Sequence, residues 1–250
     1  MVRRLLPPVL LVVLVACATP KPSLLSDPNE IISRGMDATG KASSFHVDVH
    51  LGGRLTSEPG GISFNLDGTT ASGDFDVAHR LGRVTFDAPG LFGLSGEVIQ
   101  IGADSYVKTK LTGEKYTKAS GDVNAAADPT AIFGEVSGFL DREGVKTERL
   151  ADASCGDGTC YDVTLTVPGS LLSQATGADG LGLGQLATGD VVLDLQFDQQ
   201  TLRLVQLSTD IDGGGTGSAS VLVIVSHYDQ AVEVSPPPSE LVTEGGALGP

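Results

Sequence analysis

Two kinds of hydrophobic periodicity follow each other at the start of the chain. A helix is predicted from Asp27 to about Ala42, because Asp27 can cap the first turn, Pro28 suits the first helical position, and apolar residues recur at helical spacing behind them. From 45 to 52 the period changes to two, with apolar and polar residues in alternation. This second pattern is typical of a strand that is buried on one side.

Short strand-like segments continue after this first strand, each bounded by glycine, proline or aspartate. Strands at such spacing predict an antiparallel meander. The segments are 62–68, 72–79, 82–87, 95–101 and 105–111.

A second helix is predicted behind Asp128 and Pro129, which repeat the capping pattern of the first. Its apolar residues recur at helical spacing, so this stripe must cover an apolar surface. The stripe consists of Ile132, Phe133, Val136, Phe139 and Leu140.

The second half of the chain contains the clearest strand. Between 191 and 197, Val191, Leu193, Leu195 and Phe197 alternate with other residues and define one face. Further strands are predicted at 145–150, 159–167, 202–211, 221–225 and 231–234, with a short helical stretch at 169–176.

Two segments lack such periodicity. A Gly-rich loop occupies 178–189, and its role does not follow from its sequence. The Gly-rich, acidic residues 239–250 are predicted to form a disordered tail, because they offer little apolar surface to bury.

The first residues carry a targeting signal. Arg3 and Arg4 precede an apolar run that is too short for a permanent membrane span, since a span needs about 20 apolar residues. The run ends in Leu-Val-Ala at 14–16, directly before Cys17, which resembles the lipobox of bacterial lipoproteins. An ordinary signal peptide with a cysteine at its cleavage site is the alternative.

In the lipoprotein pathway, Cys17 receives diacylglycerol and acyl chains such as palmitate, and it becomes the first residue. We therefore expect a signal peptide at 1–16, and a lipidated cysteine with a short tether at 17–26. The predicted location is the extracytoplasmic face of the cell membrane, with the lipid on Cys17 as the anchor.

The two remaining cysteines, Cys155 and Cys160, are separated by a turn-rich spacer. An exported chain meets an oxidising environment, so the pair predicts a disulfide. A redox or zinc pair is the alternative, but redox pairs usually have two intervening residues, and zinc needs further ligands nearby.

The chain is strongly acidic. Its formal net charge is −15, which becomes −17 without Arg3 and Arg4. This charge argues against nucleic acid as a partner and against peripheral binding to anionic head groups.

Candidate chemistry is sparse. His46, Asp48 and His50 share a strand face and offer metal-ligand atoms, but we interpret them as a solvated polar face. No nucleophile elbow, P-loop or dinucleotide fingerprint is present, so the sequence predicts no enzyme, no metal and no cofactor. Two aspartate pairs are interpreted as edge-strand residues that discourage aggregation: Asp74 with Asp76, and Asp210 with Asp212.

The apolar composition narrows the ligand class. Tryptophan is absent and aromatic residues make up only 5%, which argues against a sugar-stacking platform. An interior of Val, Leu, Ile and Ala suits acyl chains, although the same residues would fill a dry core equally well.

Several pieces in a fixed order resemble the LppX/LprA/LprF/LprG lipoproteins of mycobacteria and their relatives. The likeness spans about 27–238. Its pieces are the lipobox, 102–108, Asp128-Pro129 with the following helix, 140–146, 160–163, and 226–229 continued through Val232, Val234 and Pro236.

This resemblance implies an α+β fold over 27–238: a strongly curved antiparallel sheet, a half-barrel similar to the LolA/LolB carriers. Helices would pack on its concave side and enclose an apolar cavity. The chain departs from the family in its Cys155/Cys160 pair and in the loop at 178–189. The cavity lining is expected to comprise the second-helix stripe and the strand face of Val191, Leu193, Leu195 and Phe197.

The function implied by the resemblance is non-enzymatic carriage of acylated lipid or glycolipid through the cell envelope. The expected partners are the lipid, the membrane that holds Cys17, and a membrane transporter that loads or receives the lipid. A scaffold or sensor domain with a filled core is the alternative function.

Overall fold

The computed structural model describes residues 24–56, 61–120, 129–156, 158–172 and 187–244, and all of its helices and strands lie within these ranges. A chain that begins at residue 18 therefore contains every element described below. Cys17 and the signal peptide lie outside the described residues, as does most of the loop at 178–189.

Helix α1 (Pro28–Gly40) forms where the sequence predicts it. The Asp27 carboxylate accepts a hydrogen bond from the Asn29 N–H at 2.9 Å, and Pro28 occupies the first turn, where an amide donor is not needed. The helix buries Ile31, Ile32 and Met36 on one side. The predicted cap and stripe are thus both confirmed.

The rest of the described chain is mostly one open sheet whose neighbouring strands run antiparallel, with a single parallel pair at one edge. Its order is β14-β7-β6-β5-β4-β3-β1-β13-β12-β11-β10-β8, while β2 pairs with β1 and β9 with β10. The strands are β1 (Ser44–Thr56), β2 (Ser63–Asn65), β3 (Thr69–Asp76), β4 (Leu81–Ala88), β5 (Leu94–Ile101), β6 (Asp104–Thr109), β7 (Tyr116–Ser120), β8 (Lys146–Arg149), β9 (Ala153–Cys155), β10 (Gly158–Pro168), β11 (Asp190–Asp198), β12 (Leu204–Asp212), β13 (Gly217–Ser226) and β14 (Val242–Glu244).

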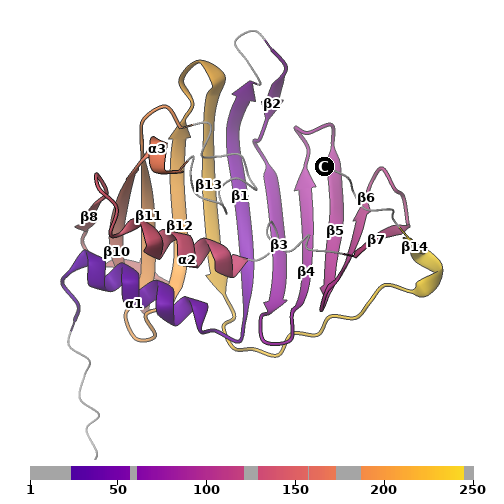
Figure 1. The fold of residues 1–250 in the computed structure, drawn as a ribbon, viewed down its shortest axis with the longest axis horizontal. Coiled ribbons are helices and arrows are strands. Elements are labelled where there is room, and N and C mark those ends of the chain that lie inside the picture. Colours follow the sequence, from indigo (N-terminus) through magenta and orange to yellow (C-terminus); the bar gives the residue numbers. More distant parts are fainter. Residues whose placement is uncertain (1–23, 57–60, 121–128, 157, 173–186, 245–250) are drawn as a thin grey trace, which may run out of the picture.

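Helices α1 and α2 (Pro129–Phe139) lie over one half of this sheet, in front of the strands from β10 to β13 (Figure 1). A third, short helix α3 (Gly169–Leu172) follows β10, and the 3-10 turns η2 (Gly214–Thr216) and η3 (Ser239–Leu241) complete the described helical elements. Side chains from α1, α2, β1 and β10–β13 form one buried apolar cluster. None of the helices in the described ranges is long and apolar enough to cross a membrane.

Two predictions at the C-terminal end are wrong. Residues 231–234 form no strand, because both edges of the preceding strand β13 are already paired, with β1 and with β12. Residues 239–244 form η3 and β14 instead of a disordered tail, and β14 pairs in parallel with the edge strand β7. Residues 245–250 lie outside the described ranges.

The interpretation of the aspartate pairs is also wrong. Asp74 and Asp76 belong to β3, which lies between β1 and β4, and Asp210 and Asp212 belong to β12, which lies between β11 and β13. Neither strand is an edge, so these carboxylates cannot protect one. Strand order depends on distant pairings that local periodicity does not contain.

Candidate functional site

One face of the sheet, called here the inner face, is the face on which α1 and α2 pack. Residues that pair across neighbouring strands point to the same face, so the register identifies its members. One row of such pairs runs across seven strands, from β10 to β4. It consists of Val163, Leu195, Leu207, Val223, Val49, Ala71 and Phe86.

A second row continues this apolar surface beyond the helices. Val47 pairs with Gly73, and the row then passes through Val84 and Val98 to Val107 on β6. The inner face is therefore apolar across nearly the whole sheet.

Burial along this face is uneven. Val163 and Leu195 are fully buried beneath the helices, whereas Val84, Phe86 and Val98 are only half-buried. These half-buried residues belong to β4 and β5, and neither α1 nor α2 covers the strands from β3 to β6 (Figure 1). We call the inner-face residues Ala71, Phe75, Val84, Phe86, Val98 and Val107 the open part of the inner face.

Glycines shape the floor of this open part. A Cβ on Gly96 would overlap the Phe86 ring, and one on Gly82 would lie 3.2 Å from the Phe75 ring. The Phe86 ring therefore lies over Gly96 and the Phe75 ring over Gly82, at positions where the neighbouring strand has no side chain. The result is an apolar surface made of aliphatic side chains and aromatic ring faces.

The predicted cavity residues all belong to the covered part, insofar as their side chains are described. Phe133, Val136 and Phe139 of α2 are buried in the apolar cluster, Leu140 packs against its margin, and the side chain of Ile132 lies outside the described part. The strand residues Val191, Leu193, Leu195 and Phe197 belong to the same cluster.

The structure thus brings the helix stripe and the strand face together, as predicted. A close contact with Phe45, whose ring centroid lies 6.0 Å from that of Phe133, ties α2 to β1. Whether these side chains line a ligand cavity stays a prediction. The open part was missed, although the alternation of Val84 with Phe86 within the predicted strand 82–87 was a visible signal.

The metal-like pattern of His46, Asp48 and His50 lies on the opposite, outer face of β1. His46 Nδ1 lies 2.7 Å from an Asp74 oxygen, and His46 Nε2 lies 3.3 Å from an Asp48 oxygen. Burial lowers the pKa of His46, but the hydrogen bond to Asp74 and the charges of both carboxylates outweigh this effect and raise the pKa above its usual range. Within the described ranges, no three His, Cys, Asp or Glu side chains are arranged to hold a metal ion.

A row of carboxylates crosses the outer face of the other half. The pKa of the Asp194 carboxyl is raised, mainly by burial and to a smaller extent by the charge of Asp210. Burial and the charge of Asp194 raise the pKa of Asp162 in the same way. Like charges held on adjacent strands disfavour one another, so this row destabilises the sheet at neutral pH.

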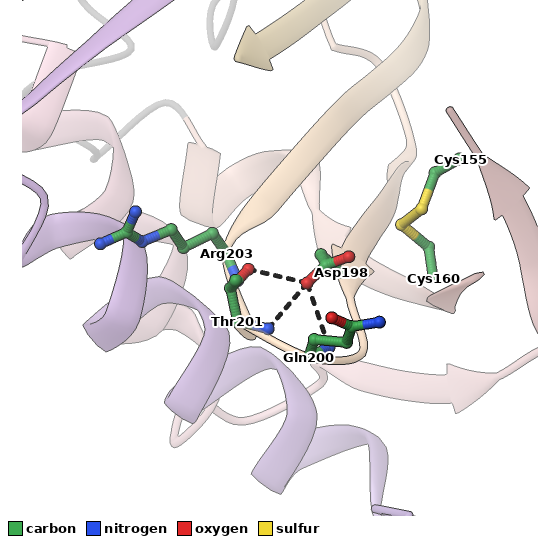
Figure 2. The surroundings of a disulfide bond; sticks show 6 residues. All are labelled: Cys155, Cys160, Asp198, Gln200, Thr201 and Arg203. Carbon is green, nitrogen blue, oxygen red and sulfur yellow. Dashed lines mark hydrogen bonds between the residues drawn. A yellow bond between two sulfur atoms is a disulfide. The ribbon is translucent and has the colours of Figure 1, made fainter. Parts of the chain in front are cut away.

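The structure links Cys155 and Cys160 by a disulfide, with Cα atoms 5.8 Å apart, across the β9–β10 hairpin. Figure 2 shows this bridge beside the β11–β12 turn, where one Asp198 oxygen accepts hydrogen bonds from Gln200 and Thr201. The disulfide therefore lies at a structural turn, away from the open part of the inner face.

The predicted tether joins the domain at Leu25. The Leu25 N–H donates a hydrogen bond to the hydroxyl of the buried Tyr161 at 3.0 Å, so Leu25 is held against the domain. At about 3.3 Å per residue, the segment from Cys17 to Leu25 spans at most about 26 Å.

Comparison with known proteins identifies the fold. The chain is similar to the crystal structure of lipoprotein LppX from Mycobacterium tuberculosis, with a TM-score of 0.57 and 19% identity over 84% of this chain and 100% of LppX. It is also similar to LprF from Mycobacterium bovis, with a TM-score of 0.56 and 17% identity over 86% of this chain and 99% of LprF. No protein-family model matches the sequence, and no curated protein matches it. The chain therefore has the fold of LppX and LprF, which confirms the fold family that the sequence resemblance predicted.

Proposed function

We propose that this chain is an envelope lipoprotein that binds an acylated lipid or glycolipid on the inner face of its sheet and carries it through the cell envelope. The observation that supports this most directly is the change in burial along a single apolar face. Leu195 is fully buried beneath the helices, while Val84 and Val98 on the same face are half-buried. An acyl chain lying on the open part would extend the apolar cluster across the sheet.

The energetics favour such a ligand. Each methylene removed from water contributes about 0.8 kcal/mol, so covering about ten methylenes would contribute about 8 kcal/mol. Association itself costs about 4 kcal/mol or more. The remaining few kcal/mol suit a carrier, which must hold its ligand and also release it.

The fold relatives bear on the shape of the site. LppX is described as a lipoprotein, and its fold matches this chain over most of both lengths. We infer that the sheet curves as a half-barrel, with α1 and α2 as one wall of an apolar cavity and the open part as the other. In this proposal, the predicted residues of α2 and β11 form the closed end of the cavity.

The proposed anchor is the lipid on Cys17, at the extracytoplasmic face of the cell membrane. A Cys17→Ser variant should accumulate as unprocessed precursor without acyl groups. Intact-mass measurement can detect both changes. Normal maturation and membrane retention of that variant would refute the anchor and leave the rest of the proposal in place.

Native mass spectrometry tests lipid binding directly. The chain from residue 18 on, purified without detergent, should retain co-purified lipid, and delipidated protein should take up a long-chain fatty acid or phospholipid. Protein that carries no lipid in either measurement would contradict the carrier function.

Neighbouring residues of β4 provide a matched pair of variants. Val84 points to the inner face and Thr85 to the outer face. Val84→Asn should lower lipid retention about tenfold, because it places an amide where apolar contact is needed. Thr85→Asn should leave retention unchanged, and equal retention by both variants would show that the open part does not bind lipid.

A scaffold or sensor domain remains the second candidate, because the covered half of the inner face is tightly packed. Phe197, Val163 and Leu165 have no exposed surface. A chain that never binds lipid and is destabilised by Val136→Trp would favour this candidate, since a packed site loses about 1 to 3 kcal/mol when it is overfilled.

A further inference from the structure

Three large apolar side chains project into solvent from one end of the sheet. Ile62 is 66% exposed, Phe92 is 94% exposed and Leu111 is 87% exposed. Each lies on or beside a turn: Ile62 directly before β2, Phe92 between β4 and β5, and Leu111 between β6 and β7. We call these three residues the apolar rim.

The three segments are neighbours in space. A Cβ on Gly90, in the β4–β5 turn, would overlap the backbone of Asn65 in β2. On the other side of that turn, a Cβ on Gly93 would lie 3.9 Å from the Lys110 Nζ, and the Lys110 N–H donates to the Ser95 carbonyl at 2.8 Å. The rim is therefore a continuous edge of adjoining segments at one end of the strands (Figure 1).

The β4–β5 turn holds its aromatic side chain outward at a conformational cost. Phe92 has φ of 58°, a left-handed conformation that bulky residues rarely adopt. The turn at 89–93 contains no charged side chain, and neither Lys110 nor any other described residue covers the Phe92 ring. A strained backbone that presents an apolar side chain to water is a feature of binding sites.

We propose that the apolar rim inserts into the surface of a lipid bilayer. Three side chains of this size expose on the order of 500 Å² together, whereas a stable protein interface needs about 800 Å² from each partner. A bilayer needs no such continuous patch, because its acyl region accepts separate projecting side chains. Lys110, next to Leu111, and Lys115, at the end of the same turn, are exposed, as is Glu114 between them. The two ammonium groups can reach lipid phosphates.

The rim and Leu25 lie at opposite ends of the sheet. Leu25 donates a hydrogen bond to Tyr161, and Tyr161 pairs with Phe197 close to the β11–β12 turn. The turns after β4 and β6 lie at the opposite end of the sheet from the β11–β12 turn (Figure 1). If Cys17 holds the anchor, the rim at the opposite end of the sheet from Leu25 can contact a second bilayer. The inference concerns this surface alone and does not depend on lipid carriage.

Vesicle flotation of the unacylated chain from residue 18 on tests the proposal. With phosphatidylcholine vesicles, the unaltered chain should float with the lipid, and 0.5 M salt should not release it, because apolar insertion is not screened. Phe92→Ala and Leu111→Ala should each lower the partition coefficient about tenfold. Val192→Ala is the matched control, since Val192 is 43% exposed on β11, away from the rim, and should bind like the unaltered chain.

Three results would overturn the proposal: no flotation of the unaltered chain, equal flotation of the rim variants and the control, or a rim variant that only changes a dimer into a monomer. The last result would assign the rim to self-association. Rim variants should keep their co-purified lipid, and Val84→Asn should keep its vesicle binding. These two measurements therefore distinguish a failure of the membrane-insertion proposal from a failure of the lipid-carriage proposal.

Discussion

A glycine in the middle of α1 permits a close contact between helix and sheet. A Cβ added at Gly35 would lie closer than 3.0 Å to three carbons of the Phe197 ring. That ring is fully buried in β11, so it has no space into which it can turn. We therefore predict that Gly35→Ala destabilises the domain, although alanine is the better helix former.

The expected magnitude follows from two opposing effects. Alanine gains about 1 kcal/mol over glycine in a helix interior. Overfilling a packed core costs about 1 to 3 kcal/mol, and contact with a rigid, enclosed ring places this site at the upper end. The free energy of unfolding should fall by about 2 kcal/mol, which lowers Tm by about 4 to 8 °C for a domain of this size.

Urea unfolding followed by circular dichroism measures this change. Gly134→Ala in α2 is the control, because a Cβ there would meet no atom within 4 Å, and it should raise stability by up to about 1 kcal/mol. Phe197→Leu should partly rescue Gly35→Ala, with a coupling energy of at least about 0.5 kcal/mol. The proposed contact would be refuted if Gly35→Ala were as stable as the unaltered protein. It would also be refuted if the effects of Gly35→Ala and Phe197→Leu on the free energy of unfolding simply added in the double variant.

Three further predictions concern stability. Replacing Cys155 and Cys160 by serine should cost about 2 kcal/mol in the chain-entropy model, and two free thiols in the untreated secreted protein would contradict the bridge. Thr39→Val should cost about 1 to 3 kcal/mol in urea unfolding, because the buried hydroxyl accepts the Leu204 N–H at 2.8 Å, whereas Thr39→Ser should cost less. Asp194→Asn should raise Tm at neutral pH: the pKa of Asp194 is raised in the folded state, so its charge lowers stability as pH rises through that pKa. This gain in Tm should vanish below pH about 3.9, the pKa of an aspartate in an unfolded chain. A difference in Tm between Asp194→Asn and the unaltered protein that does not change with pH would contradict the prediction.

Much of the secondary structure followed from local sequence. The Asp27 cap and the strand alternation at 191–197 both rest on neighbours a few residues apart, and the structure has α1 and β11 there. β14 was missed because a three-residue strand shows no period, and its partner β7 lies more than a hundred residues earlier.

The sequence by itself determined which residues are apolar on each strand and helix, and therefore that α2 and β11 would share a buried cluster. It also determined the order of pieces that resembles the LppX and LprF lipoproteins. Only the tertiary structure decided which strands lie inside the sheet, so that Asp74 pairs with His46 on an inner strand and does not lie at an edge. It alone decided where α1 and α2 lie, and hence that Val163 is fully buried while Phe86, in the same row, is half-buried. Periodicity reports the face on which a side chain lies, whereas burial depends on which distant element packs over that face.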